Sequence, residues 1–301
     1  MAPQNDIRKK IQERVQDEKK RLSKGQRLIL EYIEKHSNKA AFLTAASLGE
    51  AVGVSESTVV RFAISLGYEG YPAFQKALQE HVKQKLNSIQ RIEITSDALS
   101  QRSESEVLES VLVSDAEKIK MTLETMDAMA FERAVNTILH AKTIYIIGIR
   151  SCAPLASFLG FYLNLLFEDV RILQSSNSSE LFEQMLRIGE TDVIIGISFP
   201  RYSMRTLKAL EFANNRKAQV ITLTDSQNSP MNLYSSCSLL AKSDMASIVD
   251  SLVAPLSVIN ALVVALCMRK RGEVIQTLET LEKIWDEYQI YNNDEIREME
   301  Q

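Results

Sequence analysis

The chain is poor in the residues that mark several common classes of protein. Its 301 residues hold 10 Gly and 6 Pro, too few for a collagen-like, low-complexity or wholly disordered chain. The three cysteines are an odd number and lack CxxC spacing, so the sequence indicates neither a disulfide framework nor a zinc site. No Walker A or dinucleotide-binding fingerprint is present. We therefore expect no metal, no cofactor and a reducing environment.

Segments with the features of a targeting or membrane element are also lacking. The first 25 residues are charged throughout and have no apolar core, unlike a signal peptide. Residues 245–268 are mostly apolar, but they include Asp250, Pro255 and Asn260, and an aspartate near the centre of a bilayer is costly. We expect this segment to be a helix buried in the protein or at a subunit interface. The protein is expected to be cytoplasmic, with no membrane partner.

The charge is distributed unevenly along the chain. Residues 1–86 carry 15 Lys and Arg against 10 Asp and Glu, a net charge of +5, whereas residues 87–301 carry 20 against 29, a net charge of −9. A basic head on an acidic body is typical of a nucleic-acid reader joined to a second module, because cationic side chains supply most of the non-specific affinity for phosphate. The length of the chain also predicts two domains.

Three segments follow from the hydrophobic pattern. Residues 1–86 show only helical periodicity and are predicted to form an all-α head. The polar stretch 87–102 breaks this pattern and is predicted to be a linker. Ser103 and Glu106 have the spacing of a capping box, which predicts that a helix begins there and opens a body over residues 103–301.

The body is predicted to be an α/β domain. Short apolar, β-branched runs alternate with amphipathic segments of helical length, which indicates a parallel sheet covered by helices on both faces. The fold class is therefore α/β, with an all-α helix-turn-helix head and a three-layer α/β/α body around a parallel sheet of about five strands. The predicted strands cover residues 143–149, 170–174, 192–198, 219–225 and 237–241.

Within the head, residues 43–68 have the pattern of a helix-turn-helix motif. Gly53 supplies the tight bend, and Ser55 is placed as the N-cap of the second helix. Short polar groups at the exposed start of that helix can contact phosphates or base edges in the major groove. An ordinary helical hairpin with a solvated polar face is the alternative. The predicted DNA-binding residues are Ser55, Glu56, Ser57, Thr58 and Arg61.

Two loops of the body have the composition of an anion site. One follows the first predicted strand and holds Arg150 and Ser151; the other follows the third and holds Ser198, Arg201 and Ser203. Each loop offers hydroxyls and an arginine at the start of a helix, where unpaired backbone N–H groups favour an anion such as phosphate or carboxylate. Either arginine alone could instead be a salt-bridge partner.

Two neighbouring positions leave more than one role open. Ser247 and Asp250 stand just before the long apolar helix, where they could line the same pocket or cap that helix. In the C-terminal segment 272–291, apolar residues recur at helical spacing. This predicts an amphipathic helix that packs on the body or on a second subunit.

The head resembles the N-terminal domain of the RpiR (MurR/RpiR) family of bacterial transcriptional regulators. The resemblance rests on VSESTVVRF at 54–62, which has the form V-S-x-x-T-V-x-R-F, and on LGYEGYPAF at 66–74. Proteins of this family carry a sugar isomerase (SIS) domain as their body and bind phosphorylated sugars there. With the body included, the resemblance extends over residues from about 7 to 290.

The resemblance implies ligand contacts from Ser151, Ser198 and Ser203, at the positions of the family motifs G-x-G-S-S and S-x-S-G-x-T. The chain departs from both motifs, because an arginine replaces a glycine at position 150 and again at position 201. A charged side chain where glycine lets the backbone approach a phosphate is expected to reshape the pocket. The ligand is therefore a phosphosugar or another small anion such as a sugar acid.

Three functions are compatible with these sequence features. The leading prediction is a regulator that binds double-stranded operator DNA as a homodimer or homotetramer and responds to a small anionic metabolite. A sugar-phosphate isomerase is the first alternative, but isomerisation needs a positioned base and acid, and His140 of the body lies before the first strand, away from the expected site. We therefore expect no enzyme activity. A metabolite-binding adaptor without DNA binding is the second alternative.

Overall fold

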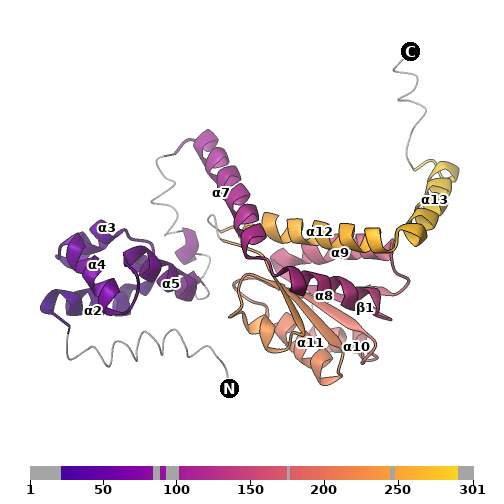
Figure 1. Cartoon of the computed structure of the whole chain (residues 1–301), viewed down its shortest axis with the longest axis horizontal. Helices are drawn as coiled ribbons and strands as arrows, with labels where there is room; N and C mark the ends of the chain where they lie inside the picture. Colours follow the sequence, from indigo (N-terminus) through magenta and orange to yellow (C-terminus); the bar gives the residue numbers. More distant parts are fainter. Residues whose placement is uncertain (1–21, 84–88, 93–101, 175–176, 245–247, 291–301) are drawn as a thin grey trace, which may run out of the picture. The chain divides into compact units, whose positions relative to one another are not determined.

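The computed structural model describes residues 22–83, 89–92, 102–174, 177–244 and 248–290. The chain divides into two compact units (Figure 1). The first contains residues 1–114 together with the short segment 244–251, and the second contains residues 115–243 and 252–301. Most of the predicted linker 87–102 lies outside the described residues. The part of the linker that is described includes residues 89–92, which form a helical turn.

The described part of the head, residues 22–83, contains helices and no strands, as predicted. A capping box formed by Ser23 and Gln26 begins the first described helix, and the Thr44 side chain caps the second by accepting from the backbone N–H of Ser47. One apolar core joins the helices, with Phe62 and Phe74 in edge-to-face contact at a centroid distance of 5.8 Å. The helices are α2 (Lys24–Ala40), α3 (Ala45–Val52), α4 (Glu56–Ser65) and α5 (Tyr71–Lys83).

A tight turn joins α3 to α4. Gly53 ends α3 in the left-handed region, with φ of 75°, a conformation that costs glycine least because it has no Cβ. The turn also brings the two helices so close that a Cβ on Gly49 would lie 2.7 Å from the carbonyl oxygen of Val54. The predicted helix-turn-helix geometry is therefore confirmed.

The helix predicted at Ser103 is confirmed as α7 (Glu104–Thr125). The Glu106 carboxylate accepts hydrogen bonds from the backbone N–H and the hydroxyl of Ser103, at 2.7 Å and 2.9 Å, and these bonds lower the pKa of Glu106. The Ser103 hydroxyl accepts in return from the backbone N–H of Glu106. The capping box is complete, so the start of this helix is fixed by local sequence.

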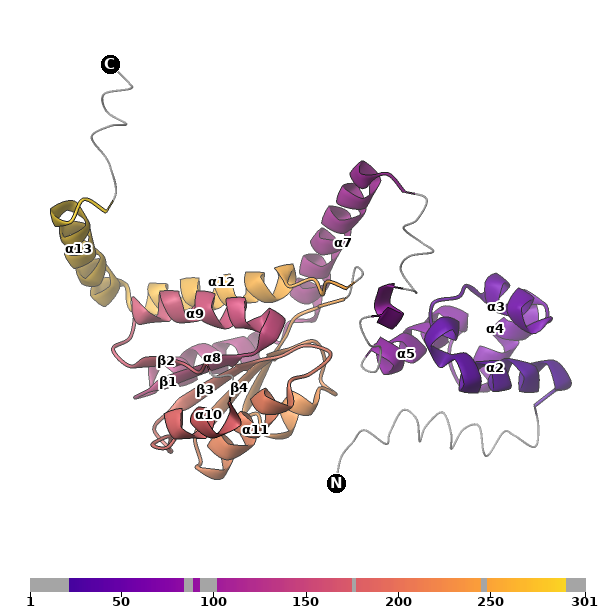
Figure 2. The same ribbon diagram turned by 180° about the vertical axis from the view of Figure 1, so that it is seen from behind.

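All five predicted strands are confirmed and form one parallel sheet in the order β2-β1-β3-β4-β5. Ile144 and Ile146 pack against α8 (Ala128–Leu139), α9 (Ala153–Asn164) and α12 (Val253–Arg269). Tyr145 and Ile147 pack into the opposite cluster with α10 (Ser178–Gln184) and α11 (Met204–Asn215). Figure 2 shows these helices covering the two faces of the sheet. Every residue of the central strands β1 and β3 is buried, which explains why these two strands are continuous apolar runs, whereas the edge strand β2 has the exposed Arg171. The strands are β1 (Ile144–Gly148), β2 (Val170–Ile172), β3 (Val193–Ile197), β4 (Gln219–Thr224) and β5 (Cys237–Leu240).

The long apolar segment is helical from Val253 as α12, and one side of this helix is buried in the core of the second unit while Val264 and Met268 are exposed. Among the residues that the structure describes, no single helix is long and apolar enough to cross a membrane. Helices α12 and α13 pass that test only as a pair, and the pair is bent by 99°. The helices of the second unit are α8 (Ala128–Leu139), α9 (Ala153–Asn164), α10 (Ser178–Gln184), α11 (Met204–Asn215), α12 (Val253–Arg269) and α13 (Arg271–Glu287).

The core of the head can be tested with Phe62→Ala. Phe62 is 1% exposed, so this truncation is expected to lower the free energy of unfolding of the head by about 3–5 kcal/mol. Leu28→Ala is the matched control, because Leu28 is 41% exposed and its truncation should cost less than about 0.5 kcal/mol. Urea denaturation followed by far-ultraviolet circular dichroism measures both, and equal losses would contradict the described core.

Candidate functional site

The predicted DNA-binding residues lie on the first two turns of α4. Glu56, Ser57 and Arg61 are exposed, and Ser57 and Arg61 are one helical turn apart on the same face. The Nε of Arg61 donates to the carbonyl oxygen of Ser57 at 3.2 Å, which holds the guanidinium over the first turn of the helix. The arrangement presents an arginine and a hydroxyl side by side on an exposed helix face.

Ser55 occupies the predicted N-cap position, but its hydroxyl does not cap the helix. It forms hydrogen bonds with the hydroxyls of Ser57 at 3.0 Å and Thr58 at 2.9 Å instead. Thr58 is half-buried, because its methyl group faces α2, where a Cβ on Gly25 would lie 3.3 Å away. Three hydroxyls therefore cluster at the start of α4, and Thr58 has one side against the core of the head.

The strand order brings the two predicted ligand loops together. The sheet grows from β1 in both directions, with β2 on one side and β3 on the other. In parallel sheets, ligands bind beyond the carboxyl ends of the two strands where the winding direction changes. The loops 148–152 and 198–203 follow β1 and β3, so both lie at this point of the sheet edge.

The first loop turns sharply out of β1. A Cβ on Gly148 would overlap the carbonyl oxygen of Cys152, so only glycine permits this path. Arg150 follows in the left-handed region with φ of 60°, a conformation that costs a non-glycine residue about 1–3 kcal/mol. Arg150 and Ser151 are exposed, whereas Cys152 is buried in the core. The arginine thus keeps the backbone conformation that a glycine favours at this position.

The second loop is held by its own serines. Ser198 is buried, and its hydroxyl oxygen accepts from the backbone N–H of Ser203 at 3.1 Å. Ser203 is the N-cap of α11, where its hydroxyl accepts from the backbone N–H of Thr206 at 3.3 Å. Both predicted ligand residues therefore shape the loop, and each hydroxyl keeps a proton that it can donate. Arg201 is exposed between them.

Two features of this edge were not predicted as site residues. The Tyr202 hydroxyl donates to the Asp225 carboxylate at 2.8 Å, which joins the loop after β3 to the residue after β4. Burial raises the pKa of Asp225, and the hydrogen bonds from Tyr202 and Thr224 oppose this shift only in part. Thr206, on the first turn of α11, is fully buried, and its hydroxyl oxygen has no hydrogen-bond partner among the described residues.

Asp250 has a partner that sequence reasoning missed. Its carboxylate forms an ion pair with Arg91 at 2.7 Å, and the two side chains are only 21% and 7% exposed. The capping alternative for Asp250 is wrong, because Leu252 is the N-cap residue of α12. Ser247 lies outside the described residues.

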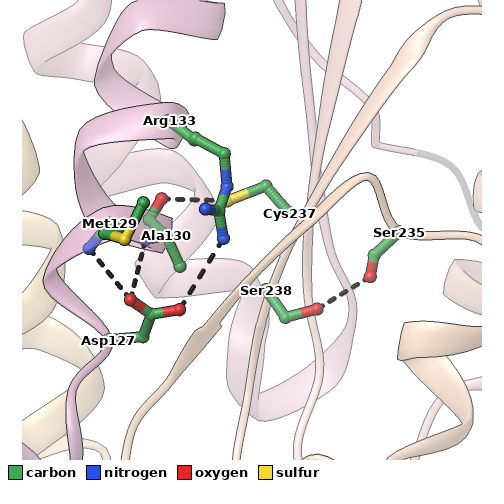
Figure 3. Close-up of polar contacts among 7 residues, drawn as sticks. All are labelled: Asp127, Met129, Ala130, Arg133, Ser235, Cys237 and Ser238. Atoms are coloured by element: carbon green, nitrogen blue, oxygen red, sulfur yellow. Dashed lines mark hydrogen bonds and ion pairs between the residues drawn. The ribbon is translucent and has the colours of Figure 1, made fainter.

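The buried cysteine of β5, Cys237, forms a hydrogen bond with a neighbouring helix. Figure 3 shows the Cys237 thiol donating to the carbonyl oxygen of Ala130 at 3.0 Å, and burial raises the pKa of this thiol. Asp127 caps the same helix, α8, by accepting from the backbone N–H groups of Met129 and Ala130. The thiol therefore ties α8 to the sheet. In the described part of the chain, no three His, Cys, Asp or Glu residues are grouped to hold a metal ion.

Comparison with known proteins matches both units. A model of the helix-turn-helix domain of the rpiR family matches residues 9–85, and a SIS domain model matches residues 137–265. The chain belongs to the RpiR family. The HTH-type transcriptional regulator HexR of Escherichia coli is 23% identical to this RpiR-family chain over 280 residues, which cover 90% of this chain and 92% of HexR. The predicted resemblance is confirmed, and the protein is a transcriptional regulator.

Two solved structures resemble this RpiR-family protein. The sugar isomerase domain of an RpiR transcription factor from Sphaerobacter thermophilus has a TM-score of 0.55 and 28% identity, and covers 58% of this chain and 97% of that domain. Vibrio vulnificus NanR, solved in complex with ManNAc-6P, has a TM-score of 0.53 and 20% identity, and covers 90% of this chain and 96% of NanR. The predicted fold class is confirmed.

The buried Asp225 can be tested by its pH dependence. Because its pKa is raised in the folded state, wild type should lose stability relative to Asp225→Asn as the pH rises above the ordinary aspartate value of 3.8, through the raised pKa. Asparagine keeps an oxygen that accepts from Tyr202 and carries no charge to bury. Urea denaturation followed by Trp285 fluorescence, between pH 4 and 8, measures the difference.

Tyr202→Phe is the partner variant, because it removes the donor and leaves the buried carboxylate. It should be least stable relative to wild type at the high end of the pH range, because the loss of the donor costs more as the Asp225 carboxyl loses its proton. A stability of Asp225→Asn that falls relative to wild type with rising pH would contradict burial as the cause of the shift.

Proposed function

We propose that this regulator binds a palindromic operator through residues 1–86 and senses a small anionic metabolite in residues 103–301, with residues 87–102 as the linker. The observation that carries the proposal is the exposed polar face of α4, set on a tight turn after α3. In helix-turn-helix proteins, this face enters the major groove. Contacts would come from Ser55, Glu56, Ser57, Thr58 and Arg61.

The anion site is proposed at the carboxyl edge of the sheet. Arg150 and Arg201 are exposed on loops after neighbouring strands, and a guanidinium can donate two parallel hydrogen bonds to a phosphate or a carboxylate. Ser151, Ser198 and Ser203 supply hydroxyls, and α11 adds backbone N–H groups at its N-terminus. The binding of ManNAc-6P by the neighbour NanR favours a phosphosugar as the ligand. The two arginines fit the carboxylate of a sugar acid as well as they fit a phosphate.

A second copy of the chain is the proposed partner subunit. Several large apolar side chains are exposed on α9, α12 and α13, the most exposed being Met268 at 75%. Large apolar side chains exposed in such numbers are typical of a subunit interface. A homodimer or homotetramer would present two recognition helices to two half-sites, about 34 Å apart along the DNA. The exposed apolar residues are Phe161, Val264, Met268, Ile275, Leu278 and Ile284.

Regulation would follow from coupling between the two sites. A ligand that changes the packing of the sensing domains would change the spacing of the recognition helices and therefore operator affinity. No catalytic step is proposed, because His140 ends α8 at the amino edge of the sheet, where its Nδ1 lies 2.7 Å from the carbonyl oxygen of Asn136. The cytoplasm, where the operator would be found, is the proposed location.

Arg61→Ala tests the DNA-binding proposal. Loss of a guanidinium that contacts a base edge should weaken operator binding by about 1–3 kcal/mol, whereas Lys35→Ala, an equal charge change on α2, should have a smaller effect. Fluorescence anisotropy with a duplex selected from a random library measures both, at several salt concentrations. Equal losses of operator affinity in the two variants would indicate that Arg61 contributes only non-specific electrostatic attraction to DNA.

Arg150→Ala and Arg201→Ala test the anion site. A ligand at ~100 times its dissociation constant adds about 2.7 kcal/mol, which should raise the melting temperature of the body by about 5–10 °C. Each variant should lose most of this shift, while Arg187→Ala, which removes an exposed arginine between α10 and β3, should keep it. The screen uses ManNAc-6P, other sugar phosphates, sugar acids and inorganic phosphate. A full shift in both variants would exclude the site.

A further inference from the structure

Helix α4, the proposed recognition helix, has one large apolar side chain that is exposed to solvent. Ile64, near the end of α4, is 52% exposed, whereas Val59, Phe62 and Ala63 of the same helix are buried in the core of the head. The helix therefore uses its other apolar residues to pack, and Ile64 stands outside that packing. Ile64 is not among the residues that the sequence assigned to DNA binding.

Ile64 lies on the same face as the proposed DNA contacts. It follows Arg61 by three residues and Ser57 by seven, and seven residues of an α-helix bring a side chain back to within about 20° of its starting direction. Ser57, Arg61 and Ile64 thus form one exposed stripe along α4. A protein that places Ser57 and Arg61 in the major groove places Ile64 there too.

The chemistry of the groove selects the contact. An exposed isoleucine gains nothing from water, and a β-branched residue is a weaker helix former than the polar residues available for that position. In the major groove of DNA, the C5-methyl group of thymine is the apolar feature that a base pair presents. An isoleucine on the reading face therefore matches thymine and no other base edge.

We propose that Ile64 contacts the C5-methyl group of a thymine in each half-site, so that the regulator selects an A·T pair at one defined position. The inference rests on the proposed function, because it requires α4 to enter the major groove. It adds to that function a specificity-determining residue. Arg61 reads a polar edge or a phosphate near the start of α4, and Ile64 reads a methyl group further along the helix.

The test removes the methyl group alone. Deoxyuridine replaces thymidine, one position at a time, in an operator duplex selected from a random library with the full chain. At one thymine in each half-site, the loss of the methyl contact should weaken binding by wild type about fourfold, the factor expected for one buried methyl-sized group. The affinities are measured by fluorescence anisotropy at fixed salt.

The variants decide which side chain reads the methyl group. Ile64→Ala loses the contact in both half-sites, so it should bind the thymidine operator about sixteenfold more weakly than wild type, about fourfold for each half-site. It should lose nothing further on deoxyuridine substitution at that position. Ile64→Val keeps a branched apolar side chain, one methylene shorter than isoleucine, and should remain sensitive to deoxyuridine. Leu28→Ala, which truncates an exposed apolar residue on α2, should behave as wild type. Circular dichroism checks that each variant is folded.

Three outcomes separate this inference from the proposed function. Equal sensitivity of wild type and Ile64→Ala to deoxyuridine at every thymine would overturn the inference and leave the function standing. If wild type is insensitive to deoxyuridine at all positions, the inference is also overturned and the proposed function stands. The same conclusion follows if sedimentation shows that Ile64→Ala changes the number of subunits. Failure of the full chain to select any duplex would instead overturn the proposed function itself.

Discussion

Burial of the sheet on both faces is the constraint from which the rest of the body follows. Successive residues of β1 point to opposite faces, so Ile144 and Ile146 pack under α9 and α12 while Tyr145 and Ile147 pack under α10 and α11. A sheet covered in this way leaves only its edges open to a ligand. The order of the strands then decides where on the carboxyl edge the chain diverges, and that point is beyond β1 and β3.

The polar groups at that edge support the loops that carry them. Ser198 accepts from the backbone of Ser203, Ser203 caps α11, and Tyr202 donates to Asp225 across two neighbouring strand ends. A buried polar group without a partner is costly, so these bonds fix the loop shape before any ligand arrives. The loops of the proposed anion site are therefore held by hydrogen bonds of their own, and the exposed Arg150 and Arg201 would add positive charge to them.

Much of this fold could be predicted because its signals are local. Short, mainly apolar and β-branched runs identified all five strands, the spacing of Ser103 and Glu106 identified the start of α7, and Gly53 identified the bend between α3 and α4. Contacts between distant residues were out of reach. Tyr202 and Asp225 meet only because β3 and β4 are adjacent, and Arg91 and Asp250 are 159 residues apart in the chain. A single sequence contains no signal for either pairing.

Some details of the sites also could not be predicted, since neighbours compete for each polar group. Ser55 has the right residue type and position for an N-cap, yet its hydroxyl bonds to the hydroxyls of Ser57 and Thr58. Thr58 has a polar and an apolar side, and the packing of α2 decides which of them faces the core. Residue type predicts that such a group is near the site, and tertiary packing decides its direction.

The replacement of glycine by Arg150 changes the chemistry of the first loop more than its path. The sequence predicts that a charged side chain reshapes the pocket, because glycine at this position would let the backbone approach a phosphate. Arg150 adopts that region nevertheless, with φ of 60°, while the close approach of Gly148 to the carbonyl of Cys152 sets the direction of the turn. This backbone conformation costs free energy in a non-glycine residue, which suggests that the Arg150 side chain has a function that offsets the cost. If Arg150 and the exposed Arg201 on the loop after β3 form the proposed anion site, their guanidinium groups would favour an anion that accepts two parallel hydrogen bonds over a neutral sugar.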